Sequence, residues 1–363
     1  MSSTRPLTIG IDARAAIEVP AGRGRVVREL LRALAAREDA HSYRCYARTR
    51  WEEPLDARFE WREIAARDPR WHLRAARDAQ RECDVFLSSN SYLTPLFMRT
   101  PAVVIVYDLL AFDRAMRPNL RSAVVERLTL GACMRRAEAV IAISHATADA
   151  LAARFPATAA RTTVALLGTS PTLAEPGPDE PLPEPGFVLA VGTLEPRKNL
   201  PRLVAAYGQL DTATQSRHPL VVVGPLGWET GETLEALHSL GERAILLGHV
   251  SDAALAELYR RCAVFCYPSL GEGFGLPVLE AMAAGAAVLT AASSSLPEVG
   301  GDAVEYADAS DVASIAAGLQ RLLDSPARRA ELSALALERA REFSWERFAE
   351  RALAVLERAA LRG

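Results

Sequence analysis

Short apolar segments alternate with amphipathic helical stretches along the chain, and this alternation most constrains the fold. In the first half, apolar segments of strand length lie at residues 7–12, 85–87, 102–107, 139–143 and 163–167. Helical patterns occupy residues 26–37, 122–136 and 146–155. Strands that alternate with helices form parallel sheets with helices on both faces. The sequence therefore predicts an α/β protein.

A proline-rich stretch interrupts this alternation at residues 171–186. Its six prolines exclude a helix or a central strand. Beyond it, strand patterns resume at residues 187–191, 220–223, 244–247, 264–267 and 287–291. At roughly 150 residues per domain, 363 residues predict two domains. We expect a first domain at 1–170, a linker at 171–186, a second domain at 187–343, and a final helix at 344–363 that crosses back to the first domain.

Both domains are expected to be doubly wound, Rossmann-like sheets. Such sheets bind ligands beyond the carboxyl ends of their strands. Two of them facing each other would place the ligand in a cleft between the domains. Functional residues are therefore expected in the loops that follow strands.

The formal net charge of −3 hides an asymmetry between the two halves. Residues 1–175 contain 26 arginines and 20 acidic residues, whereas the remainder contains 16 basic and 25 acidic residues, so the halves carry +6 and −9. This distribution favours a local basic surface that faces phosphate or an anionic membrane. It argues against a general nucleic-acid binder.

Targeting and redox signals point to the cytoplasm. No apolar run reaches the 18 to 20 residues that a membrane span requires, and the amino terminus lacks the pattern of a signal peptide. The five cysteines are scattered, which is typical of buried thiols rather than of a disulfide framework or a zinc site. The expected location is the cytoplasm, with peripheral contact at the inner membrane face left open.

The single lysine, Lys198, lies in the segment 192–201 after the first strand of the second domain. All other basic residues are arginines, so a retained lysine indicates a place that needs a compact charge. Together with Arg197, Lys198 could neutralise a diphosphate. The chain has no Asp-x-Asp pair that would bridge a diphosphate through a metal, so no metal cofactor is expected. The alternative is an exposed basic turn paired with Glu195.

The segment 271–282 follows a predicted strand and carries three glycines at alternating positions. Glycines at such a turn let backbone N–H groups cradle an anion at a helix amino terminus, which suggests phosphate. Glu272 and Glu280 are electrostatically wrong for phosphate itself, but would accept hydrogen bonds from hydroxyl groups beside it. A nucleotide sugar satisfies both requirements. The alternatives are a plain strand-to-helix turn and, for Glu280, a solvated acid favoured by the helix dipole.

Four segments carry a family resemblance: residues 194–199, 247–252, 272–280 and 295–303. Together they resemble the retaining GT-B glycosyltransferases of family 4, group 1 type, which include bacterial mannosyltransferases. The resemblance extends over nearly the whole chain and is densest at 187–305. It implies the GT-B fold, a nucleotide-diphospho-sugar donor, and a glycan or lipid-linked acceptor.

The resemblance also implies roles for individual residues. Glu280 would hold the ribose hydroxyls and Glu272 the donor sugar, while Arg197 and Lys198 would hold the diphosphate. The backbone near Val250 would contact the base. The remaining donor-binding positions of the glycine loop would be Gly273, Phe274, Gly275 and Leu276.

In the amino-terminal half the match is looser. Gly22 and Gly24 correspond to a glycine-rich loop that approaches the donor phosphates or the acceptor. Tyr107 replaces a site histidine of many relatives, next to Asp108, which the resemblance places in the catalytic site. His145 would lie near the cleft, although Ser144 before it is equally typical of a helix N-cap. In the second half, Thr193 stands as a substrate-binding position where relatives have arginine.

The segment 44–81 interleaves arginines and acids with Trp51, Trp61 and Trp71. Such tryptophans could seat the domain on a membrane interface, which would suit a lipid-linked acceptor. The favoured interpretation is half-buried core aromatics over salt-bridged helices.

The expected reaction is a retaining, metal-independent transfer of a hexose, with GDP-mannose as the leading donor by resemblance and UDP-glucose next. Since no pair of carboxylates must lie across the anomeric carbon, same-face attack is favoured over an enzymic nucleophile. The open alternatives are a nucleotide-sugar epimerase, a phosphorylase, and a non-catalytic protein that binds a nucleotide sugar as a scaffold.

Overall fold

The computed structural model describes residues 5–20, 22–112, 120–169, 181–227 and 230–362. The chain divides into two compact units, of which the first contains residues 1–168 and 344–363 and the second residues 169–343. The last segment of the chain therefore belongs to the first unit. Residues 171–180 of the expected linker lie outside the described residues.

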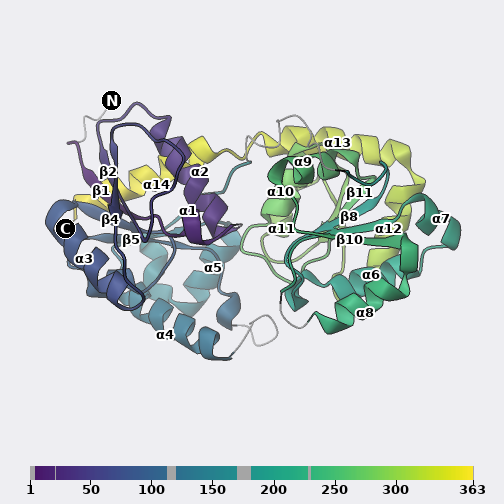
Figure 1. Ribbon diagram of the computed structural model, residues 1–363, viewed down its shortest axis with the longest axis horizontal. Helices are drawn as coiled ribbons and strands as arrows, with labels where there is room; N and C mark the ends of the chain where they lie inside the picture. Colours follow the sequence, from purple (N-terminus) through teal and green to yellow (C-terminus); the bar gives the residue numbers. More distant parts are fainter. Residues whose placement is uncertain (1–4, 21, 113–119, 170–180, 228–229, 363) are drawn as a thin grey trace. The chain divides into compact units, whose positions relative to one another are not determined.

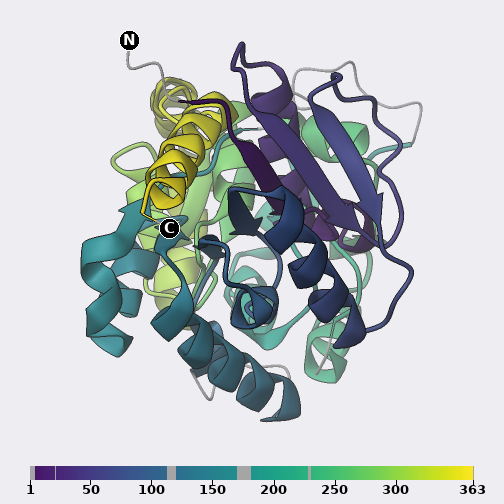
Figure 2. The ribbon, with the colours of Figure 1, turned by 90° about the vertical axis from the view of Figure 1, so that its left-hand side faces the viewer.

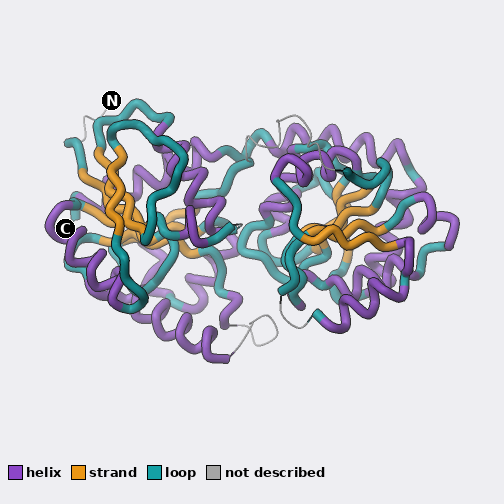
Figure 3. The backbone as a smooth tube through the Cα atoms, in the orientation of Figure 1, coloured by secondary structure: helices purple, strands orange, loops and turns teal. Residues whose placement is uncertain are grey.

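Within the described residues, the first unit is built on a seven-stranded sheet with all pairs parallel. Its strand order is β3-β2-β1-β4-β5-β6-β7, the doubly wound arrangement. Figures 1 and 3 show this sheet between layers of helices. The strands are β1 (Thr8–Asp12), β2 (Ser42–Ala47), β3 (Phe59–Glu63), β4 (Val85–Ser88), β5 (Ala102–Val106), β6 (Ala139–Ala142) and β7 (Thr162–Val164).

Helices connect and cover these strands. They are α1 (Ala15–Glu18), α2 (Arg23–Ala35), α3 (Arg70–Glu82), α4 (Leu120–Arg136), α5 (His145–Arg154) and α14 (Trp345–Ala360), with the 3-10 turns η1 (Thr94–Phe97), η2 (Leu110–Phe112) and η3 (Pro156–Arg161). Figure 2 shows α14, in yellow, beside the first unit's sheet, where it contacts α2 and the strands β4, β5 and β6. Its buried stripe includes Phe348, Leu353 and Leu356.

The segment 44–81 corrects the expectation of salt-bridged helices. Residues 42–47 and 59–63 form β2 and β3, and within this segment only α3 is helical. Arg44 and Glu60 are partners on these two neighbouring strands and form a salt bridge. This ion pair therefore lies across two strands of a sheet and not along one helix. Trp71 is fully buried, as the core interpretation predicted. Trp51 and Trp61 are half-buried.

A buried ion pair fixes the end of β1 to the start of α3. Asp12 accepts two hydrogen bonds from the Arg14 guanidinium, at 3.0 and 2.8 Å. Arg14 lies 3.7 Å above the Trp71 ring, and both charged residues are buried. Since a buried charge is tolerated only when it is paired and hydrogen-bonded, this contact locks the first strand to the helix that follows β3.

The second unit repeats the arrangement with a six-stranded parallel sheet in the described residues, of order β10-β9-β8-β11-β12-β13. The strands are β8 (Val188–Val191), β9 (Leu220–Val223), β10 (Ala244–Gly248), β11 (Val264–Tyr267), β12 (Val288–Ala291) and β13 (Glu305–Ala307). The helices are α6 (Leu200–Gly208), α7 (Thr212–Arg217), α8 (Gly231–Ser239), α9 (Asp252–Arg261), α10 (Leu276–Ala283), α11 (Leu296–Gly300), α12 (Val312–Asp324) and α13 (Pro326–Ala340), with the turns η5 (Pro196–Lys198) and η6 (Gly241–Arg243).

Buried strands and cysteines complete the fold. All four residues of β11 and of β12 are buried, as expected for a parallel sheet covered on both faces. All five cysteines lie in the described part of the chain and are free thiols; Cys83 and Cys262 are half-buried and the others buried. No helix of the described residues has the length and apolarity to cross a bilayer.

Candidate active site

The strand order of the second unit reverses between β8 and β11, and the two loops that follow these strands meet there. A doubly wound sheet binds its ligand at this reversal point. The backbone N–H of Leu270 donates to the carbonyl of Arg197 at 2.8 Å. The buried Asn199 amide donates to the carbonyls of Pro268 and Ala309, at 3.0 and 2.7 Å. These contacts fix the turn that carries the predicted cations against the loop after β11.

The predicted cations and the first predicted carboxylate meet at this point. Glu272 Oε1 lies 2.6 Å from Lys198 Nζ, and Glu272 Oε2 lies 2.6 Å from Arg197 Nη1. Lys198 and Glu272 side chains are each only 9% exposed. Arg197 Nε also contacts Glu195 Oε1 at 2.6 Å. Arg197 therefore has the partner of the basic-turn alternative, but Lys198 is buried, which that alternative did not expect.

These contacts shift the protonation equilibria. Burial alone would raise the pKa of Glu272, but the charges of Lys198 and Arg197 lower it to about 2. Burial lowers the pKa of Lys198, against the attraction of Glu272. The pKa of Arg197 is raised: burial opposes the charged form, and Glu272 outweighs it. With Glu195, the four groups form a compact cluster of two positive and two negative charges.

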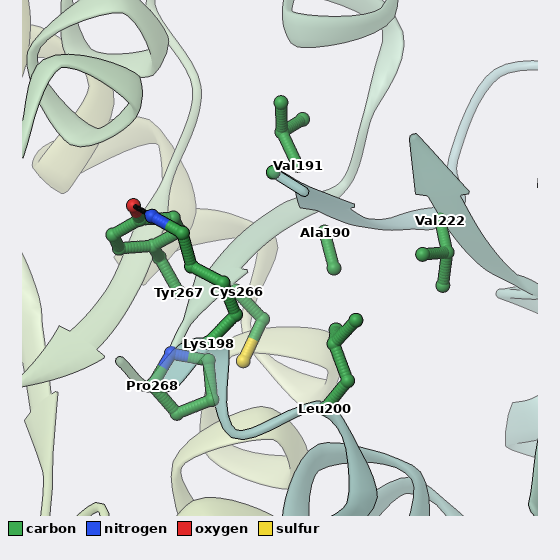
Figure 4. Close-up of a pocket in the computed structure, with 9 residues that line it drawn as sticks. Ala190, Val191, Lys198, Leu200, Val222, Cys266, Tyr267 and Pro268 are labelled. Carbon is green, nitrogen blue, oxygen red and sulfur yellow. Dashed lines mark hydrogen bonds between the residues drawn. The ribbon is translucent and has the colours of Figure 1, made fainter. Parts of the chain in front are cut away.

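Two neutral residues that the sequence did not point to, Tyr267 and Ser269, also bind this cluster. Lys198 Nζ donates to the Tyr267 hydroxyl, which donates to Glu272 Oε1 at 2.8 Å. Ser269 Oγ donates to the same carboxylate oxygen at 2.7 Å. Figure 4 shows the Lys198 side chain running to the hydroxyl of Tyr267. Tyr267 ends an apolar strand, so in the sequence it is indistinguishable from a core residue.

A small cavity lies beside Lys198, lined also by Gly192, Leu200, Cys266 and Tyr267 (Figure 4). It has room for no more than about one water molecule. Gly192 has φ +143°, and a Cβ built there would lie 3.1 Å from the Lys198 Cε. The lysine stem therefore packs closely against the backbone of Gly192.

The glycine loop leads into α10 as expected. Gly275 precedes the helix with φ +103°, a backbone conformation that residues other than glycine rarely adopt. Gly273 and Leu276 are half-buried at the entry to the helix. Phe274 points inward, is buried, and packs against Phe343 with ring centroids 5.9 Å apart. The Phe274 side chain thus serves the core rather than a solvent-facing donor site.

Glu280 lies in the second turn of α10 and is 4% exposed, so the alternative of a solvated acid is wrong. The hydroxyl of Tyr259, from α9, donates to Glu280 Oε2 at 3.2 Å. Tyr259 is a further residue that the sequence analysis missed. A buried carboxylate held by a tyrosine is a suitable acceptor for ligand hydroxyls.

Two other predicted positions lie at the same edge of this sheet. Thr193 follows β8 and is half-buried. Val250 follows β10, is half-buried, and immediately precedes Ser251, whose hydroxyl caps α9 by accepting from the Ala254 N–H at 3.1 Å. Val250 thus lies in the loop between the carboxyl end of β10 and the start of α9.

In the first unit, Tyr107 follows β5 and is 6% exposed. Its hydroxyl donates to the carbonyl of Ser89 at 2.8 Å, and the Arg23 guanidinium lies 5.3 Å from its ring centroid. The neighbouring Asp108 is half-buried and accepts from the N–H of Leu110 at 3.0 Å. The Tyr107 hydroxyl is therefore engaged by the main chain, where a histidine would present a titratable nitrogen.

The glycines near the amino terminus differ from the expected loop. Arg23 begins α2, so only Gly22, with φ +52°, remains outside the helix. A Cβ on Gly24 would lie 1.7 Å from the carbonyl oxygen of Val19, so Gly24 permits close packing of α2. His145 is exposed at the first position of α5, and the Ser144 hydroxyl caps that helix by accepting from the Thr147 N–H at 3.0 Å.

Within the described ranges, no group of three or more His, Cys, Asp or Glu side chains is placed to hold a metal ion. The charges near the reversal point of the second sheet are instead the guanidinium and ammonium groups of Arg197 and Lys198 and their carboxylate partners.

Comparison with known proteins gives matches along both units. Residues 20–173 match the Glycosyltransferase Family 4 and residues 178–339 match the Glycosyl transferases group 1. The O-antigen chain mannosyltransferase B of Escherichia coli is 33% identical over 301 residues, covering 79% of this chain and 76% of that protein.

Two solved structures have a similar fold. Sucrose-phosphate synthase from Thermosynechococcus elongatus has a TM-score of 0.76 at 20% identity and covers 99% of this chain and 100% of its own. The Anabaena protein HepE, solved with UDP and glucose, has a TM-score of 0.73 at 17% identity and covers 96% and 99%.

Proposed function

The chain belongs to the group 1, family 4 glycosyltransferases of GT-B fold, and we propose that it transfers a hexose, with mannose favoured, from a nucleotide-diphospho-sugar to a hydroxyl of a glycan or lipid-linked acceptor. The predicted family, fold class and enzyme class are confirmed. The choice of mannose is supported by the mannosyltransferase relative. The observation that carries the donor class is the meeting of Lys198, Arg197 and Glu272 at the sheet's reversal point.

The donor is proposed to bind along the carboxyl edge of the second sheet. Arg197 and Lys198 hold the diphosphate, since an ammonium and a guanidinium can neutralise its charge together. Glu272 accepts hydrogen bonds from the sugar, and Glu280, held by Tyr259, accepts them from the ribose. The base lies against the backbone near Val250. In this structure the Glu272 carboxylate accepts hydrogen bonds from both Arg197 and Lys198. The donor phosphates would therefore compete with Glu272 for these two cations.

The transfer is proposed to be retaining and metal-independent. The bond from the anomeric carbon to the phosphate oxygen breaks, and the acceptor oxygen forms its bond on the same face. The acceptor proton passes to the departing phosphate oxygen. Lys198 and Arg197 stabilise the negative charge that develops on the diphosphate, which is the role that a metal plays elsewhere.

The first unit is proposed to serve the acceptor. Asp108, Tyr107 and Gly22 lie at or beyond the carboxyl ends of its strands or at the start of α2. His145 lies at the same edge, after β6. A lipid-linked acceptor would bring the protein to the inner face of the membrane. The buried Trp71 does not support a membrane contact through the segment 44–81.

A panel of nucleotides and their sugars tests the donor. At a hundredfold excess over Kd, the cognate nucleotide should stabilise the folded protein by about 2.7 kcal/mol, visible as a rise in Tm. Transfer from the matching sugar to a mannosylated acceptor is then followed by NMR, which reads the anomeric configuration of the product. Activity should persist with EDTA.

A pair of variants distinguishes a loss of the site from a general effect of removing a positive charge. Lys198→Ala should abolish transfer, whereas Arg217→Gln, which changes an exposed cation on α7, should retain it. The proposal fails if no nucleotide or nucleotide sugar raises Tm. An inverted product would refute the retaining mechanism, and a loss of activity in EDTA that a divalent metal restores would refute metal independence.

A further inference from the structure

The hydroxyl of Tyr267 lies between the Lys198 ammonium and the Glu272 carboxylate. It accepts from Lys198 Nζ and donates to Glu272 Oε1 at 2.8 Å. The result is a directed chain from ammonium to hydroxyl to carboxylate. A hydroxyl can serve one partner as acceptor and another as donor at the same time.

Burial makes this hydroxyl costly to remove. Lys198 is 9% exposed, so its ammonium depends on protein acceptors in place of water. The acceptors within reach are Glu272 and the Tyr267 hydroxyl. In a buried chain of this kind each hydrogen bond polarises the next, so that both ends are held more firmly than by the ion pair alone.

We propose that Tyr267 is a positioning residue for the transfer, whose hydroxyl fixes the Lys198 ammonium and the Glu272 carboxylate relative to each other at the donor site. The role of these two groups toward diphosphate and sugar rests on the proposed function. Tyr267 itself touches neither in this scheme and acts through its two neighbours. Ser269, which donates to the same oxygen of Glu272, supports the carboxylate from the loop.

The proposal has a definite electrostatic consequence. Lys198 faces Glu272 from the loop before α10, Arg197 and Glu195 from the turn after β8, and Tyr267 from β11. Removing the hydroxyl takes an acceptor from the ammonium, which lowers the pKa of Lys198. It also takes a donor from the carboxylate, which raises the pKa of Glu272. The higher pKa of Glu272 raises the lower limit of the pH range in which both Lys198 and Glu272 are charged, and the lower pKa of Lys198 reduces its upper limit.

Tyr267→Phe is the appropriate change because the ring keeps its packing. The Tyr267 ring stacks on Phe265, with centroids 5.7 Å apart. Tyr207→Phe is the matched control. Tyr207 is a fully buried tyrosine of α6, outside the site, and its hydroxyl lies 3.0 and 3.1 Å from the carbonyl oxygens of Gln215 and His218, to either of which it can donate. Both variants lose a buried hydroxyl, but only one of them contacts the charged cluster.

The sole lysine allows a direct measurement without substrate. In protein labelled with ¹³C-lysine, the only side-chain Cε signal is that of Lys198, so its titration in NMR spectra reads one pKa. Tyr267→Phe should move the midpoint to lower pH, and Tyr207→Phe should leave it in place. An unchanged midpoint in folded Tyr267→Phe would overturn the proposal. This readout does not depend on any donor, so it distinguishes a failure of this proposal from a failure of the proposed function.

Kinetics gives the second readout. Tyr267→Phe should lower kcat/KM for the donor about tenfold or more, as expected for lost hydrogen bonds to charged groups, with a narrower pH profile. Tyr207→Phe should keep the wild-type rate and profile. Equal losses in the two variants, or a reduced rate with an unchanged profile, would show a purely structural role and contradict the proposal. Urea unfolding of both variants confirms that they are folded in the range used.

Discussion

Glu272→Gln tests the charged cluster at its centre. Glutamine preserves the size of the side chain and removes its charge, so Lys198 and Arg197 lose their shared partner. A pKa of about 2 for Glu272, against an ordinary value of 4.5, corresponds to roughly 3 kcal/mol of stabilisation of the folded state. Breaking a buried ion pair typically costs about 3 to 5 kcal/mol. Burial already lowers the pKa of Lys198, so loss of its proton should keep the cost near the lower figure.

The pH dependence follows from the sign of the shift. The pKa of Glu272 is lower in the folded state, so its contribution is fully present above about pH 4.5 and is lost as the pH falls toward 2. The variant should therefore be less stable than wild type by about 3 kcal/mol at pH 7 and by only about 1.5 kcal/mol at pH 3. Other carboxylates titrate in both proteins and cancel in the difference.

Urea unfolding followed by circular dichroism at pH 7, 5, 4 and 3 measures this difference. Because the chain has two units, each curve is fitted with two transitions, and the effect is expected in one of them. Glu232→Gln is the control, since Glu232 is an exposed acid in the first turn of α8, and it should change stability by less than about 0.5 kcal/mol. A difference that is constant across this pH range would refute the reasoning.

Three further predictions concern the same unit. Lys198→Arg should reduce transfer about a hundredfold, because the stem packs against Gly192 and a small misplacement of the cation is costly; wild-type rates would contradict this. Glu195→Gln should tighten binding of GDP or UDP about fivefold in calorimetry, since Arg197 loses a competing partner at 2.6 Å; weaker binding would show that Glu195 orients the guanidinium instead. Gly275→Ala should destabilise the protein by about 2 kcal/mol in thermal unfolding, because φ is +103° and a Cβ would meet a leucine side chain at 2.8 Å; an unchanged Tm would contradict this.

Most of the second unit could be predicted from the sequence because its strands are short apolar runs bounded by glycine and proline. The segments that form β2 and β3 were harder to predict. Residues 59–63 alternate acidic residues with Arg62, and residues 42–47 include Arg44, so neither segment is a plain apolar run. Their strand character depends on partners distant in the chain, such as Arg44 opposite Glu60. Single-chain hydropathy contains no information about such a pairing.

The site shows the same division. Residue chemistry and spacing predicted that Lys198, Arg197, Glu272 and Glu280 gather at one edge of the second sheet, because loops after parallel strands converge at one end of a sheet. Only the tertiary structure decided that Glu272 neutralises both cations, and that Tyr267 joins them. The physical reason is that burial and hydrogen-bond partners are set by elements that meet only after folding. In the sequence, Tyr267 is the last residue of an apolar strand and is predicted to be a core residue. Only the folded chain places the buried Lys198 ammonium against its hydroxyl.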